Sequence, residues 1–123
     1  MILLDTNIFI EAIRENPIIK KEVIAVSTEN TCTSIVCVAE LYFGARDKQE
    51  FNQITKDLKG IKIYPIETAV SLLALDLMKQ HVLANRVNYA DFLIAATCLH
   101  HQLPIYTLNK KDFKFIPCIQ FYK

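Results

Sequence analysis

Four acidic side chains stand where the chain passes between predicted secondary-structure elements. Asp5 directly follows an apolar run, Glu40 and Asp91 lie in apolar helical segments, and Asp112 comes just after the apolar segment 105–107. Two carboxylates about 5 Å apart repel by about 3 kcal/mol at an effective dielectric of about 20. A divalent cation offsets that repulsion, and oxygen ligands favour Mg²⁺ or Mn²⁺. The four acids together therefore predict a metal site, although their convergence depends on the fold.

Taken singly, each acid also has a structural interpretation, which comes first for any one of them. Asp5 can cap a helix, with Thr6 and Asn7 as alternative caps. Asp91 and Asp112 each follow an asparagine by three residues, which is the spacing of a capping box. Glu40 can pair with Arg46. Only the set of four favours a shared cation over these separate roles.

The elements that must bring the acids together are short apolar strands alternating with helices. The pattern predicts strands at 1–4, 31–33, 61–64, 105–107 and 118–121, and helices at 8–15, 18–26, 35–46, 47–58, 67–83 and 88–101, with a helical turn at 110–113. Such alternation is typical of an α/β fold with a mainly parallel sheet of four or five strands between helices. Ligands of such sheets bind outside the carboxyl ends of the strands, where these acids fall.

Composition limits the classes of protein that this chain can be. Its 123 residues, 52% of them hydrophobic and 22% charged, predict one globular domain spanning residues 1–123. Only 2 glycines argue against a Gly-rich phosphate loop. The net charge of +1 gives no general attraction to nucleic acid, so phosphates would have to be held by locally placed charges. The positive mean hydropathy of +0.22 leaves apolar surface for a partner subunit.

The cysteines and the N-terminal residues bear on where the protein works. Cys32, Cys37, Cys98 and Cys118 form no CxxC pair, which excludes a zinc finger. Because they lie in apolar stretches, we expect reduced, buried thiols. No apolar run approaches the ~20 residues of a membrane span, and a signal peptide is not expected, so the predicted location is the cytoplasm.

Other side chains beside the acids have two open interpretations. Short polar residues near them either cap helices or hydrogen-bond to metal-bound water, and both roles can coexist: Thr6, Asn7, Ser34, Thr107 and Asn109. Lys110, Lys111 and Arg86 are either solvated surface or contacts for phosphate groups. The aromatic residues Tyr42, Phe43 and Tyr89 could form stacking surfaces for a ligand, but the core is the preferred place for them.

Four segments in order resemble the PIN-domain family, and within it the VapC toxins of prokaryotic type II toxin–antitoxin systems. These segments are LLDTN at 3–7, AELYFGA at 39–45, DFLIAAT at 91–97 and TLNKKDF at 107–113. The resemblance covers residues 2 to about 121. It departs before the third acid, where the family often has Gly-Arg and this chain has Asn85-Arg86.

The resemblance implies a PIN-like three-layer sandwich and a Mg²⁺- or Mn²⁺-dependent endoribonuclease that cleaves phosphodiester bonds of RNA, possibly tRNA. Asp5, Glu40 and Asp91 match the catalytic core acids of the family, Asp112 matches the more variable fourth, and Thr107 and Asn109 match nearby small polar residues. The resemblance also implies a homodimer and inhibition by a small VapB-like antitoxin.

Two alternatives stay open, and a third is disfavoured. A PIN-type nuclease could act in RNA processing or on DNA outside a toxin–antitoxin pair. A non-catalytic PIN scaffold could only bind RNA or protein, although none of the four acids is missing here. A haloacid dehalogenase-type phosphatase is disfavoured, because its second Asp would stand at the position of Asn7.

Overall fold

A parallel sheet of four strands forms the centre of the computed structural model, which describes residues 1–123. Its strands are β1 (Ile2–Leu4), β2 (Thr31–Ser34), β3 (Lys62–Tyr64) and β4 (Ile105–Tyr106), in the order β3-β2-β1-β4. Leu3 of β1 pairs with Cys32 of β2 and with Ile105 of β4. All strands point the same way, so their carboxyl ends lie at one edge, as predicted.

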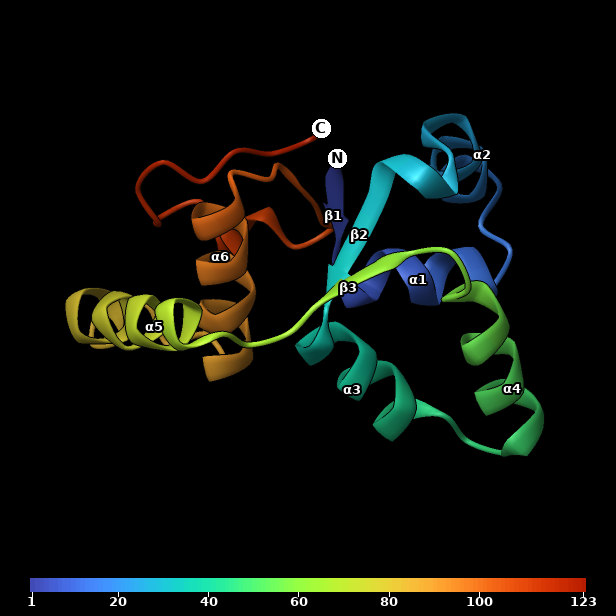
Figure 1. The fold of residues 1–123 in the computed structure, drawn as a ribbon, viewed down its shortest axis with the longest axis horizontal. Coiled ribbons are helices and arrows are strands. Elements are labelled where there is room, and N and C mark those ends of the chain that lie inside the picture. Colours follow the sequence, from blue (N-terminus) through green and yellow to red (C-terminus); the bar gives the residue numbers. More distant parts are fainter.

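Six α-helices cover the sheet and complete the three layers expected for the fold. They are α1 (Thr6–Ile13), α2 (Pro17–Val26), α3 (Ile35–Gly44), α4 (Lys48–Asp57), α5 (Thr68–His81) and α6 (Tyr89–His101). Figure 1 shows α5 and α6 on one side of the strands and α1, α2 and α4 on the other, with α3 below their carboxyl ends. None of these helices is both long and apolar enough to cross a bilayer.

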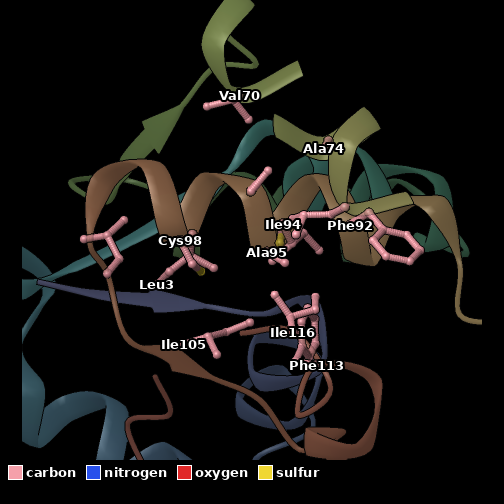
Figure 2. Packing of buried hydrophobic residues seen from close by; sticks show 14 of the residues in the cluster. Leu3, Val70, Ala74, Phe92, Ile94, Ala95, Cys98, Ile105, Phe113 and Ile116 are labelled. Carbon is pink, nitrogen blue, oxygen red and sulfur yellow. The ribbon is translucent and has the colours of Figure 1, made fainter. Parts of the chain in front are cut away.

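Alternating side chains of the strands build a separate core on each face of the sheet. Leu3 and Ile105 face the cluster under α5 and α6, whereas Leu4 and Tyr106 face the cluster under α1 and α4. Figure 2 shows α6 lying between β1 and α5. Because α6 is enclosed in this way, seven of its residues are buried, including Phe92 and Thr97. The start of α6, which carries Asp91, is thereby held firmly against the sheet.

Three predictions from the sequence are wrong in detail. The strand predicted at 118–121 is a single bridge between Ile105 and Phe121, because β4 has only two residues to pair with and the preceding Pro117 has no N–H. Helix α1 begins at Thr6 rather than at residue 8, since Asp5 caps it. Helix α3 ends at Gly44 instead of continuing to residue 46.

The prediction of buried, reduced thiols holds for three of the four cysteines. Cys32, Cys37 and Cys98 are buried and free, whereas Cys118 is free but exposed. Cys118 lies in the C-terminal tail with φ of +67°, outside the sheet that was expected to bury it. Burial raises the pKa of Cys37 to about 12 and that of Cys32 to about 11, so these thiols are neutral packing groups.

Candidate metal-dependent active site

Asp5 occupies the joint between β1 and α1. Its backbone N–H donates to the carbonyl of Tyr106 at 3.0 Å, which continues the pairing of β1 with β4. One carboxylate oxygen, Oδ1, accepts from the backbone N–H of Thr6 at 2.8 Å, and Oδ2 accepts from the hydroxyl of Thr107 at 2.7 Å. The residue is only 6% exposed. Asp5 can therefore cap α1 and serve in the candidate site at the same time, without a change in the position of its side chain.

The burial of Asp5 sets its electrostatics. Desolvation raises the pKa of this carboxyl above its ordinary value, and hydrogen bonds from Thr107 and Thr6 act in the opposite direction. The charges of Glu40 and Asp112 raise the pKa further. Asp5 is thus a fixed, buried carboxyl group whose pKa responds to the charges of two of the other predicted acids.

Glu40 lies on α3, whose start is fixed by Ser34. The buried Ser34 hydroxyl accepts from the backbone N–H of Val36 at 3.1 Å, as predicted for an N-cap. Glu40 itself is exposed, and its Oε1 accepts from the Thr6 hydroxyl at 2.8 Å. The alternative pairing with Arg46 is wrong, because Arg46 binds Glu50 one helical turn further on at 3.0 Å. Glu40 is therefore turned towards the end of β1.

Asp91 stands in the first turn of α6. The Asn88 side chain caps this helix by accepting from the backbone N–H of Ala90 at 2.9 Å, in line with the predicted capping box. Burial raises the pKa of Asp91 to about 7, with further increases from the charges of Asp112, Asp5 and Glu40, while the Asn88 backbone N–H lowers it. Without a cation, this carboxyl titrates near neutrality.

Asp112 ends the short 3₁₀ turn η2 (Lys110–Asp112), which follows β4. Its backbone N–H donates to the Asn109 carbonyl at 3.0 Å, and its half-buried side chain precedes the fully buried Phe113. The Asn109 side chain makes no capping hydrogen bond, so the second predicted capping box is wrong. The hydrogen bonds at this turn are instead made by the N–H groups of the two residues before it, Leu108 and Asn109.

Asp5 and Asp112 follow β1 and β4, Glu40 lies in the middle of α3, and Asp91 lies in the first turn of α6. Their charges act on one another, and every ion pair of the structure uses other acids. No three His, Cys, Asp or Glu side chains stand so close together that they could hold an ion as they are. The donor set nevertheless suits a hard divalent cation, being all oxygen and without a basic partner.

The predicted basic residues differ in their surroundings. Lys110 Nζ lies 5.5 Å from the centre of the Phe121 ring, so part of its charge faces an aromatic ring. Lys111 and Arg86 are exposed and have no ion-pair partner. These two cations are free to meet an anionic ligand.

An apolar groove beside Glu40 was not predicted from the sequence. It has a volume of about 480 Å³ and is lined by Ile35, Phe43 and Tyr89 together with Glu40 and Asn88. Phe43 is 93% and Tyr89 71% exposed, and Tyr42 is also exposed, so their preferred assignment to the core is wrong. The sequence signal was ambiguous because α3 is apolar on nearly all sides, which hides its outer face.

Comparison with known proteins agrees with this architecture. A family model of the PIN domain matches residues 2–116. A chain in a toxin–antitoxin complex from Klebsiella pneumoniae has a similar fold, with a TM-score of 0.81 and 24% identity over 97% of this chain and 95% of that one. Chains in VapBC2 from Rickettsia felis bound to promoter DNA and in DNA-bound VapBC from Salmonella typhimurium each have a TM-score of 0.84 and 22% identity over 98% of this chain and 97% of theirs. No curated protein matches in sequence. The chain belongs to the PIN-domain family.

Proposed function

We propose that this protein is a metal-dependent endoribonuclease and the toxin of a type II toxin–antitoxin pair. The observation that carries the proposal is that Asp5, Glu40, Asp91 and Asp112 act on one another: burial raises the pKa values of Asp5 and Asp91, and the charges of the other acids raise them further. Membership of the PIN-domain family supports a nuclease. The fold shared with chains of toxin–antitoxin complexes supports the toxin role, which would place the protein in the cytoplasm.

Mg²⁺ or Mn²⁺ is the cofactor that fits these donors. Asp5 would be the fixed ligand, since two strong hydrogen bonds hold its carboxylate. Glu40, Asp91 and Asp112 are exposed or half-buried and would turn onto the ion. When bound, such an ion lowers the pKa of a water molecule and withdraws charge from a phosphate.

No histidine is placed to transfer a proton at this site. His81 packs against Phe115. His101 is the last residue of α6, at the end away from Asp91, and lies 3.4 Å from Glu67. Near neutrality, the groups beside the substrate that can hold a proton are therefore carboxyls, above all Asp91 with its pKa of about 7. We therefore expect the ionisation of Asp91 to depend more strongly on a bound cation than that of the other acids.

RNA is the proposed substrate, with tRNA as one candidate class. Lys111 and Arg86 would contact phosphates flanking the bond that is cleaved, whereas Lys110 is partly occupied by Phe121. The balanced overall charge fits a ligand that is recognised locally rather than attracted from a distance.

A small VapB-like antitoxin is the proposed inhibitor. A cavity of about 160 Å³ beside α1, α3 and α4 has Glu40 in its lining, together with apolar Ile10, Ile13 and Ile54 and charged Arg14, Arg46 and Glu50. An antitoxin segment carrying one apolar side chain and a basic group would fill this cavity and cover Glu40. Inhibition would then follow from blocking an acid of the site.

Two copies of the chain are proposed to associate through the groove containing Phe43 and Tyr89. Exposed aromatic residues of this size are typical of interface cores. Sedimentation of the wild type and of Phe43→Glu would test this: the variant should be monomeric at concentrations where the wild type is dimeric. A wild type that stays monomeric at high concentration would contradict the homodimer.

The nuclease proposal is tested by incubating the purified chain with RNA and with DNA oligonucleotides of the same sequence, in Mg²⁺ and in EDTA. RNA should be cut only with Mg²⁺, and Asp91→Asn should abolish cutting. Expression of the chain alone should arrest bacterial growth, whereas Asp91→Asn should not. Cleavage of DNA alone would favour the alternative nuclease, and no cleavage of either would favour a binding scaffold.

A further inference from the structure

The Asn7 side chain contacts a loop that lies a hundred positions away in the sequence. Its Oδ1 accepts from the backbone N–H of Leu108 at 3.2 Å. Its Nδ2 lies 3.4 Å from both the Thr107 hydroxyl and Asp5 Oδ2. These contacts are possible because β1 and β4 are parallel neighbours, so that α1 and the loop after β4 start side by side.

The hydrogen-bonding capacity of the Thr107 hydroxyl is fully used within the protein. A hydroxyl has one hydrogen to donate and two lone pairs to accept with. Thr107 is 4% exposed, donates to Asp5 Oδ2 at 2.7 Å, and accepts from the Asn109 backbone N–H at 3.1 Å and from Asn7. It has no capacity left for metal-bound water, which was one of the two roles expected for it.

The same contacts fix the segment that leads into the turn η2. The side chains of Asp5, Ser34 and Asn88 cap α1, α3 and α6, but the turn η2 has no side-chain cap of its own. Instead, the N–H groups of the two residues that precede it, Leu108 and Asn109, are bound by Asn7 and Thr107. The position of η2, and with it Asp112, is therefore set from β1 and α1.

We propose that Asn7 is a positioning residue that, with Thr107, holds Asp112 in register with Asp5. Asn7 acts through the Leu108 backbone and not by contact with substrate or ion. The role of this register in a metal site rests on the proposed function, whereas the arrangement of the loop rests only on the hydrogen bonds described above.

The first test is independent of metal. Amide hydrogen exchange of the metal-free protein should show Leu108 exchanging about 10-fold faster in Asn7→Ala than in the wild type, because its protecting hydrogen bond is lost. Asn109, whose N–H keeps its bond to Thr107, should exchange faster to a smaller extent as the loop loosens. Asn52→Ala, the same change at an exposed position of α4, is the matched control and should leave both rates unchanged. Unchanged rates in Asn7→Ala would overturn the proposal. If Asn7→Ala does not fold, Asn7→Ser, whose side chain is too short to reach Leu108, takes its place.

The second test asks whether Asn7 acts through Asp112. Calorimetric titration with Mn²⁺ should show about 10-fold weaker binding by Asn7→Ala, a loss typical of groups that orient metal ligands. Asn7→Ala should cause no further loss when added to Asp112→Asn, yet should still weaken binding when added to Asp91→Asn. Equal losses in both backgrounds would overturn the proposal. A wild type that binds no Mn²⁺ would contradict the metal site, and the exchange rates alone would then decide the role of Asn7.

Discussion

The two halves of the candidate site are held in different ways. Asp5 is buried and receives two short hydrogen bonds, from Thr6 and Thr107. Asp91 is half-buried, and only the Asn88 backbone N–H lowers its pKa, against the effect of burial and the charges of three other acids. Burial raises the pKa of both acids, but two hydrogen bonds offset part of this rise at Asp5, whereas little offsets it at Asp91, whose charge therefore depends more on a cation.

The largest effect should be on catalysis. Asp5→Asn and Asp91→Asn should each lower the rate of RNA cleavage in Mg²⁺ by more than about 100-fold, since even the outer partners of metal ligands contribute about 10–100-fold. Initial rates on a labelled oligonucleotide measure this. Asp76→Asn, on the exposed face of α5, is the control and should cleave at the wild-type rate. Wild-type cleavage by Asp5→Asn would refute its assignment as a ligand.

Thermal stability should separate the two acids in the absence of metal. The raised pKa of Asp91 means that the folded protein holds a proton that the unfolded chain releases as the pH rises above about 4. The contribution of Asp91 to the stability of the wild type should therefore be fully present below this pH and be lost as the pH rises through about 7. Asp91→Asn should remove this loss and raise Tm at pH 7.5, with no difference near pH 4.

Asp5→Asn should behave in the opposite way and lower Tm. An amide has one oxygen where the carboxylate has two, and its NH₂ group would face a Thr107 hydroxyl whose lone pairs are already used. The expected loss is about 1 kcal/mol for one broken hydrogen bond. Unfolding curves of both variants in EDTA measure the contrast. A rise in Tm for both variants would show that repulsion dominates the whole site.

Features that depend on local sequence could be predicted, whereas those that depend on contacts between distant segments could not. The four acids, the parallel sheet and the N-caps at Ser34 and Asn88 are local patterns, namely residue types at strand ends and before apolar helical runs. The contact of Asn7 with Leu108 joins positions far apart in sequence and arises only when β1 and β4 pair, so no local spacing predicts it. The same reason accounts for Phe43, since which side of an apolar helix faces outward is decided by its neighbours.

The cap of α6 should have a smaller effect than the acids. Asn88→Ala removes the acceptor for the Ala90 N–H, which typically costs about 1 kcal/mol. It should also loosen the first turn that carries Asp91, so Mn²⁺ affinity should fall together with stability. Ser34→Ala removes a similar cap from α3, but Glu40 lies further along that helix. It should therefore reduce stability with less effect on Mn²⁺ binding, which denaturation and calorimetry can distinguish.

The smallest effect should come from the lysines near Asp112. In the Asp91→Asn background, Lys111→Ala should weaken RNA binding about 2- to 5-fold. The slope of the logarithm of the binding constant against the logarithm of the salt concentration should become shallower by about one, as expected for the loss of a single phosphate contact. Lys110→Ala should weaken binding less, because the Lys110 ammonium already lies over the Phe121 ring. Fluorescence anisotropy at several salt concentrations measures both. If Lys110→Ala has the larger effect, the Lys110 ammonium leaves the Phe121 ring when RNA binds. The loop that carries Lys110 and Asp112 would then rearrange on binding, in contrast to the fixed carboxylate of Asp5.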